Sequence, residues 1–236
     1  MKIEKCILIA KRNISTTPIL RVGLPLWLKI ECMTQDFWNE RYNREEYVYG
    51  EEPNEYLKQQ LGKFPPGKIL FPLEGEGRNA VYAAGIGWQA DAFDMSAEGR
   101  KKAMLLAEKK NVHINYRIGE LSELSYEEGA YDAMVLIFAH FPADKKAAYH
   151  SRLNSYLKKG GVVILEAFSK KQLEYSSVNP AAGGPRDEAM LYSEEELRTY
   201  FKDFDIIELY ETDTELHEGA FHNGKSAVVR FTGRKK

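Results

Sequence analysis

The chain has 236 residues, of which 44% are hydrophobic and 29% are charged, a balance typical of a globular α/β domain with a substantial core. A formal net charge of −2 gives no electrostatic case for binding nucleic acid, and no apolar run is long enough to span a bilayer. The sequence has two cysteines, Cys6 and Cys32, and both lie ahead of the main domain. The rest of the chain can therefore hold neither a disulfide framework nor a cysteine-based metal site, which suits a reducing compartment. We therefore expect a cytoplasmic protein without a metal, nucleic-acid or membrane partner.

The first 32 residues differ in charge from the rest. They carry +4, which leaves −6 on the remainder. No apolar stretch followed by a small-residue cleavage site marks a signal peptide, and Glu4 and Glu31 weaken a transit peptide. We predict a poorly ordered N-terminal extension over 1–32, such as translation from upstream of Met33 would give, and one domain over 33–236.

Two short helices and a loop open this domain. Thr34 is the predicted N-cap of a helix over 35–41, and helical spacing resumes over 55–61. The first helix and the loop between the two contain Phe37, Trp38, Tyr42, Tyr47 and Tyr49. Core packing explains each aromatic residue taken alone, but as a group, with two of them in a loop, they favour a lid over a ligand.

A strand, a glycine turn and a helix then follow one another. The apolar run 68–71 predicts a buried strand, Gly75 and Gly77 a tight turn, and residues 79–84 a helix. Because glycine has no Cβ, backbone N–H groups can approach a ligand at the helix N-terminus. The unit predicts a nucleotide cradle, and Gly75-x-Gly77-x-x-Ala80 also satisfies the dinucleotide pattern.

Two acids, Glu74 and Glu76, flank the first glycine of this turn. A pyrophosphate would meet both carboxylates at close range, an unfavourable approach of like charges. S-adenosylmethionine (SAM) carries a sulfonium, an ammonium and one carboxylate, and no phosphate. The turn therefore favours SAM over NAD, and an NAD-dependent oxidoreductase remains the alternative.

The next predicted strand, 88–93, stops at Asp94. An acid about twenty residues past the glycine turn, at the carboxyl end of the second strand, suits two ribose hydroxyls. The other role open to Asp94 is that of a helix N-cap, but Ser96 already fills it for a helix over 97–110. We favour the ribose interpretation.

The third and fourth strands, 112–118 and 130–138, end at further candidate residues. Gly119-Glu120-Leu121 follows the third strand, and Glu120 either binds an adenine amino group or is a solvated loop acid. The fourth strand is fully apolar and reads as central and parallel. His140 follows it, at the edge where open α/β sheets bind ligands, and either lines the site or caps a neighbour.

The remaining elements complete the alternation and then break it. A helix over 144–157 precedes a strand over 162–168, and the long irregular segment 169–192 is a candidate substrate lid. After a helix over 194–201, opened by a capping box at Ser193, come two strand-like runs with no helix between them. These runs, 204–211 and 226–232, read as an antiparallel pair joined by a linker over 212–225.

Five strand–helix alternations predict an α/β fold with a doubly wound, Rossmann-like sheet. The terminal hairpin separates SAM-dependent methyltransferases from dinucleotide dehydrogenases. From about Met33 onward the chain resembles class I SAM-dependent methyltransferases of the tellurite-resistance and thiopurine-methyltransferase-like group. The resemblance is carried by Phe37–Tyr42, Tyr49–Asn54, Glu74–Asn79, Leu157–Gly161 and Glu215–His217.

The resemblance implies a seven-stranded, mostly parallel sheet with an antiparallel last strand, SAM as cofactor, and a small-molecule methyl acceptor such as a thiol or another soft nucleophile. We expect a monomer or a homodimer. His217, whose counterpart in the tellurite-resistance branch lies on the substrate side, and His140 are the candidate catalytic bases. The expected cofactor-binding residues are Trp38, Tyr42, Glu74, Gly75, Glu76, Gly77, Asn79, Asp94, Met95, Ser96, Gly119, Glu120, Leu121 and Phe138.

One position departs from the family pattern. The family usually has an acid at the end of the first strand, where it helps to order the loop and the methionine end of SAM, and here Phe71 stands in its place. Glu74 or Glu76 is the candidate substitute. The departure leaves open a protein that binds SAM or S-adenosylhomocysteine with reduced or lost activity.

Overall fold

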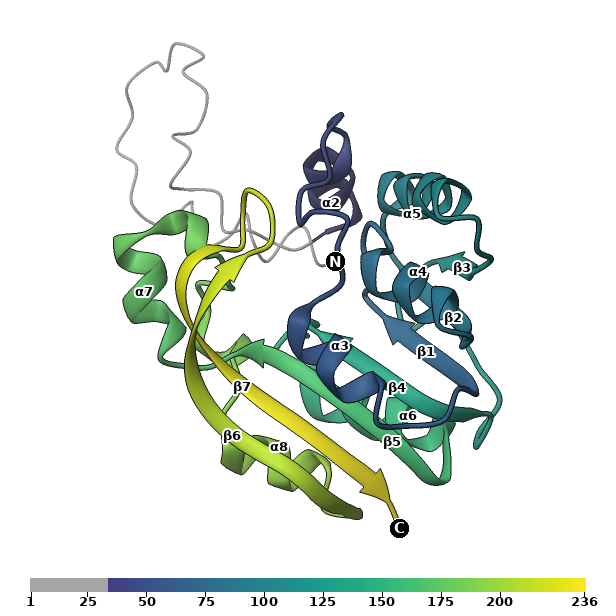
Figure 1. Ribbon diagram of the computed structural model, residues 1–236. Helices are drawn as coiled ribbons and strands as arrows, with labels where there is room; N and C mark the ends of the chain where they lie inside the picture. Colours follow the sequence, from purple (N-terminus) through teal and green to yellow (C-terminus); the bar gives the residue numbers. More distant parts are fainter. Residues whose placement is uncertain (1–33) are drawn as a thin grey trace, which may run out of the picture. The chain divides into compact units, whose positions relative to one another are not determined.

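The computed structural model describes residues 34–236, so the predicted extension over 1–32 lies outside the described residues. The described part is built on one seven-stranded sheet with strand order β3-β2-β1-β4-β5-β7-β6 (Figure 1). The strands are β1 (Lys68–Pro72), β2 (Gln89–Asp94), β3 (Asn115–Ile118), β4 (Tyr131–Ile137), β5 (Leu157–Phe168), β6 (Phe204–His217) and β7 (Asn223–Lys235).

The strand directions confirm the predicted fold class. Strands β1 to β5 are mutually parallel, whereas β7 lies between β5 and β6 and runs antiparallel to both. Strand β1 has β2 on one side and β4 on the other, so the order of the strands reverses between β1 and β4. In open α/β sheets a ligand binds in the crevice outside the carboxyl ends of the strands at such a reversal.

Helices cover both faces of the sheet because both faces are apolar. One core lies under α3 (Glu55–Leu61), α4 (Arg78–Gly85) and α5 (Ala97–Lys109), and the other lies under α6 (Lys146–Tyr156) and α8 (Glu194–Tyr200). Aromatic rings fill much of this space, including Phe71 and Tyr56 in the first core and Phe231 and Phe201 in the second. Outside these layers lie α2 (Gln35–Tyr42) and α7 (Gln172–Val178).

The terminal hairpin is longer than the sequence predicts. Strand β6 continues to His217 and β7 begins at Asn223, so the predicted linker over 212–225 shrinks to the five residues 218–222. The segment pairs as strand because backbone hydrogen bonds and cross-strand pairs such as Thr214 with Ser226 extend the ladder beyond the apolar runs. As a consequence, His217 belongs to a strand.

Two other boundaries differ from expectation. The segment 169–192 contains α7 and two short 3-10 helices, Pro180–Ala182 and Glu188–Met190. Strand β5 begins at Leu157, five residues before the predicted start of the strand at residue 162. The capping box at Ser193 is present as predicted. Within residues 34–236, none of the helices has the length and apolar character needed to cross a membrane.

Replacement of a core ring should show how much the hairpin contributes to stability. Phe231 of β7 is fully buried, and its ring stacks on Phe201 with centroids 4.4 Å apart. Phe231→Ala removes this packing and leaves a cavity, so we expect the free energy of unfolding to fall by about 3–5 kcal/mol. Urea denaturation measures the change.

The matched control is Ile207→Ala on β6, where 47% of the side chain's surface is exposed. This substitution should cost less than about 1 kcal/mol. An equal loss in the two variants would mean that the Phe231 ring is not packed as described.

Candidate functional site

The glycine turn is held in place from several sides. Gly75 and Gly77 have φ of 62° and 85°, a left-handed conformation that glycine adopts without strain. The Tyr116 hydroxyl donates to the Gly75 carbonyl at 2.6 Å. A Cβ on Gly75 would stand 2.6 Å from the Tyr42 hydroxyl, and one on Gly77 would stand 2.5 Å from the Cβ of Ala103. The turn is therefore fixed in shape, with the N-terminus of α4 behind it.

Backbone strain gathers at the reversal between β1 and β4. Leu73, just after β1, has φ of 55°, and Phe138, just after β4, has φ of 51°. Left-handed conformations cost non-glycine residues of order 1–3 kcal/mol and concentrate at ligand-binding sites. The strain thus marks the edge where the topology alone already predicts a ligand.

Asp94 ends β2 beside the glycine turn. Its two carboxylate oxygens accept hydrogen bonds from the backbone N–H groups of Gly75, at 3.1 Å, and Ser96, at 2.8 Å. Burial raises the pKa of the Asp94 carboxyl to about 6, although these hydrogen bonds act in the opposite direction. A carboxylate oxygen can accept more than one hydrogen bond, so Asp94 retains capacity to accept hydrogen bonds from ligand hydroxyls.

Glu74 is the second acid of the turn. Its carboxylate accepts a hydrogen bond from the Ala80 N–H at 2.7 Å, and desolvation raises the pKa of this carboxyl to about 7, although part of the side chain meets solvent. Neither Glu74 nor Asp94 forms an ion pair with a described lysine, arginine or histidine. Two desolvated acids without an ion-pair partner among residues 34–236 suit a cationic ligand.

The carboxylate of Glu76 turns away from this site, contrary to our expectation that both acids face the ligand. It is buried and accepts hydrogen bonds from the Val48 N–H at 2.8 Å and the Lys102 ammonium at 2.9 Å. The loop that follows α2 needs an acceptor for its backbone, and Lys102 needs a counter-ion. Glu76 meets both needs, so it ties the loop to α5.

Several other expected cofactor residues border the same edge of the sheet. The Gly119 N–H donates to the Asp94 carbonyl at 3.0 Å, which places the end of β3 beside the end of β2. Glu120 is exposed and lies 3.4 Å from Lys145. Leu121, by contrast, is buried in the core under α6, so its side chain packs inward.

The remaining expected residues hold α2 and its loop against the turn. Trp38 and Tyr42 stack with ring centroids 5.5 Å apart, and Ser96 caps α5. The Met95 carbonyl accepts a hydrogen bond from the Gln35 side chain at 2.9 Å. Asn79 accepts one from the Asn54 N–H at 3.0 Å.

The two expected histidines lie in different surroundings, and only His140 has both ring nitrogens engaged. His140 is buried, with Nδ1 3.0 Å from the Met190 carbonyl and Nε2 accepting from the Phe168 N–H at 3.3 Å. Burial lowers the pKa of His140 to about 4. His217 is exposed on β6, next to the buried Leu216, because side chains alternate along a strand.

A pair of residues that the sequence did not single out lies at the site instead. Glu218 and His222, at the two ends of the turn between β6 and β7, are both largely buried. His222 Nδ1 lies 3.3 Å from Glu218 Oε2. The predicted linker over 212–225 contained both residues, but the resemblance to the tellurite-resistance branch favoured His217. A shorter turn, with its two ends in fixed positions, would have singled them out.

Glu218 joins the hairpin turn to the glycine turn. Its carboxylate accepts from Arg78 of α4 at 2.7 Å and from the Asn54 amide at 2.9 Å. The Arg78 guanidinium is the main influence that holds the pKa of Glu218 at about 2 against the effect of burial. Asn54 also donates to Glu166 of β5 at 2.6 Å, and Glu166 pairs with Arg230. The chain of contacts crosses the site from α4 to β7.

Aromatic rings surround His222. Its ring centroid lies 4.5 Å from that of Tyr49, 4.4 Å from that of Phe138 and 5.1 Å from that of Phe168. These residues come from the loop after α2 and from the ends of β4 and β5. The site thus has an acidic side at the glycine turn and an aromatic side at His222.

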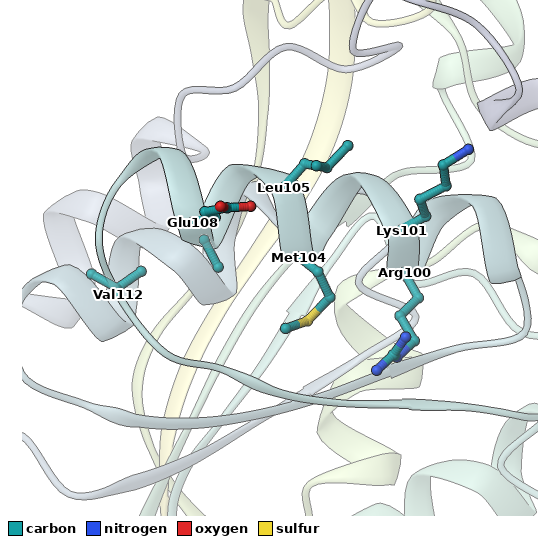
Figure 2. Close-up of a pocket in the computed structure, with 7 residues that line it drawn as sticks. Arg100, Lys101, Met104, Leu105, Glu108 and Val112 are labelled. Carbon is teal, nitrogen blue, oxygen red and sulfur yellow. The ribbon is translucent and has the colours of Figure 1, made fainter.

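A hollow of about 510 Å³ lies elsewhere, on α5 (Figure 2). Figure 2 shows its side chains spread along that helix, with Val112 beyond the helix's C-terminal end. It is lined by Arg100, Lys101, Met104, Leu105, Ala107, Glu108 and Val112. None of these is an expected site residue, so the hollow is separate from the site at the glycine turn.

The residues at the turn fit SAM better than a dinucleotide. Glu74 and Asp94 lack an ion-pair partner among the described residues, and a pyrophosphate would add negative charge beside them. A sulfonium and an ammonium would supply the missing positive charge. The sheet order, the glycine turn and these acids define a class I SAM-dependent methyltransferase.

Comparisons with known proteins identify the family. The model of the family "Tellurite resistance protein TehB" matches residues 30–233. The chain therefore belongs to the TehB family. It is 22% identical over 211 residues to the probable S-adenosyl-L-methionine-dependent methyltransferase TehB of Haemophilus influenzae strain 10810, which covers 87% of this chain and 68% of the relative.

Two solved structures share the fold. TehB from Haemophilus influenzae superposes with a TM-score of 0.63 and 19% identity, covering 86% of this chain and 67% of that one. Magnesium protoporphyrin IX methyltransferase (ChlM) from Synechocystis PCC 6803, solved with bound S-adenosylhomocysteine, superposes with a TM-score of 0.61 and 18% identity. The match covers 86% of this chain and 98% of that one.

The raised pKa of Glu74 should appear in the stability of the protein. The folded state keeps this proton up to about pH 7, whereas an unfolded glutamic acid loses it near 4.5. The resulting stability is complete below pH 4.5 and is lost as the pH rises through 7. We expect a loss of about 1–3 kcal/mol in wild type relative to Glu74→Gln between pH 4.5 and 8, measured by urea denaturation.

The comparison with the variant isolates this group. His140 and His150, whose pKa values burial lowers to about 4 and 3, destabilise the fold as the pH falls below 6.5, but wild type and variant share them equally. Parallel stability curves for the two proteins would contradict a raised pKa at Glu74.

Proposed function

We propose that this protein transfers a methyl group from SAM to a small, soft nucleophile, a thiol or a chalcogen oxyanion, and that it acts as a monomer or a homodimer in the cytoplasm. The observation that carries the proposal is the pair of desolvated acids, Glu74 and Asp94, on either side of a rigid glycine turn. Membership of the TehB family supports it.

SAM supplies a methyl group bound to a positively charged sulfur, which makes the methyl carbon electrophilic. Asp94 binds the ribose hydroxyls, because it ends β2 and retains acceptor capacity beside its two backbone hydrogen bonds. Glu74, whose carboxylate also accepts from the Ala80 N–H, binds the ammonium group of SAM. Gly119 and Glu120, at the end of β3, border the adenine.

Phe71 is compatible with this arrangement of SAM-binding residues. Phe71 belongs to β1 and is fully buried in the core under α3, α4 and α5, where a carboxylate would lack partners. Glu74, three residues later, brings a carboxylate to the open side of the same turn. The acid that the family usually places at the end of the first strand is thus replaced from within the loop.

The acceptor binds on the aromatic side. Phe138, Phe168 and Tyr49 provide polarisable faces, and polarisable sulfur contacts such rings favourably. The protein's contribution to the reaction is to hold the nucleophile in line with the methyl carbon and to exclude water, effects that supply much of the acceleration in displacement reactions.

A thermal-shift panel tests the cofactor, and a labelled-methyl assay tests the reaction. SAM and S-adenosylhomocysteine should raise the melting temperature, whereas NADH and ATP should not. Transfer from methyl-labelled SAM to thiols or tellurite should follow. SAM binding without transfer to any of these acceptors would instead favour a binding protein, and stabilisation by NADH alone would favour an oxidoreductase.

Asp94→Ala tests the ribose contact. Removal of the carboxylate leaves the two hydroxyls without their acceptor, so we expect SAM affinity to fall by about 1–3 kcal/mol in titration calorimetry. Asp205→Ala, which removes an acid of β6 whose side chain is 73% exposed, should leave the affinity unchanged. Equal affinity in Asp94→Ala and wild type would remove Asp94 from the cofactor site.

A further inference from the structure

The contact with Glu218 fixes how the His222 ring presents its two nitrogens. Glu218 is held ionised by Arg78, so its oxygen can only accept a hydrogen bond. His222 Nδ1, 3.3 Å from that oxygen, therefore carries the ring proton. Nε2 then has a free lone pair, and it makes no hydrogen bond with any residue among 34–236 whose contacts are described.

The surroundings keep the ring neutral and poised to accept a proton. Burial lowers the pKa of His222, and this effect outweighs the hydrogen bond and charge of Glu218, which raise it. The charged and titratable groups that face it are Glu218 from its own turn, Arg78 from α4, Arg41 from α2, Tyr49 from the following loop, and His140 after β4. Its uncharged neighbours include the rings of Phe138 and Phe168 and the backbone of Gly183.

We propose that His222, positioned by Glu218, is the base that takes the proton of a protonated acceptor, and that the acceptors of this protein therefore include thiols that are un-ionised at neutral pH. The proposal rests on the methyltransferase function proposed above. It assigns the role to the histidine of the turn, in place of His217 on the strand and His140 in the core.

The proposed step is balanced. The thiol proton passes to His222 Nε2 while the sulfur's electron pair forms the bond to the methyl carbon. The bond between that carbon and the sulfonium breaks, and its electrons neutralise the positive sulfur. The products are a methyl thioether, S-adenosylhomocysteine and a protonated His222, which returns its proton to solvent. An acceptor that is already anionic needs no base.

This difference between acceptors gives the test. His222→Gln keeps a polar side chain of similar reach but cannot act as a base at neutral pH. We expect it to lower kcat/KM for 2-mercaptoethanol, which is protonated at pH 7, by about 100-fold or more. For 4-nitrothiophenol, which is ionised at this pH, the loss should stay below about threefold.

The pH profiles of the two proteins should also differ. With 2-mercaptoethanol, wild-type kcat/KM should reach a plateau above the pKa of His222, whereas the variant's should rise about tenfold per pH unit with the thiolate fraction. His113→Gln, an exposed histidine before β3, is the matched control and should retain the wild-type profile.

A measurement independent of turnover addresses Glu218. In wild type, the ¹⁵N chemical shifts of His222 should report a proton on Nδ1, and Glu218→Gln should yield a mixture of tautomers. Equal losses of His222→Gln on the two thiols, or a loss in His217→Gln alone, would overturn the proposal. Failure of SAM to stabilise the wild-type protein would instead overturn the function on which it rests.

Discussion

The buried ion pair between Arg78 and Glu218 joins two parts of the chain that are 140 residues apart, at 2.7 Å. Arg78 begins the helix behind the glycine turn, and Glu218 begins the turn of the terminal hairpin. Burying both charges removes their hydration, so such a pair is tolerated only when further hydrogen bonds satisfy each member. Asn54, His222 and the backbone carbonyl of Tyr49 supply those hydrogen bonds, so the pair joins three segments: the start of α4, the hairpin turn and the loop between α2 and α3.

A second buried pair, Glu76 with Lys102, fixes the same loop from the other side. Together the two ion pairs position the loop after α2, and in each pair the two charges neutralise one another. Among the described residues, Glu74 and Asp94 at the site form no ion pair, and desolvation raises the pKa of each, although the nearby Arg78 charge acts in the opposite direction on Glu74. Glu76 therefore serves to hold the loop, whereas Glu74 and Asp94 accept backbone hydrogen bonds and also suit a cationic ligand.

The sequence predicted most of the fold because its signals were local. The glycine turn, the capping box at Ser193 and the apolar fourth strand each depend on residues near one another, and the structure confirms them. The extension of the hairpin depended instead on pairing across strands, for instance of Thr214 with Ser226, which single-strand hydrophobicity does not reveal. His217 was preferred to His222 because the resemblance to the tellurite-resistance branch singled it out, whereas the predicted linker contained both histidines.

The direction of the Glu76 side chain was beyond reach for a related reason. Two acids one residue apart in a turn look equivalent in sequence, and only the approach of Val48 and Lys102 from other segments distinguishes them. The site still suits a cationic ligand with one acid of the turn in place of two, because Asp94, at the end of β2, lies next to the turn that carries Glu74. Which carboxylate is available to a ligand depends on the tertiary contacts that each one makes. Val48 and Lys102 engage Glu76, whereas Glu74 and Asp94 form no ion pair with any described residue.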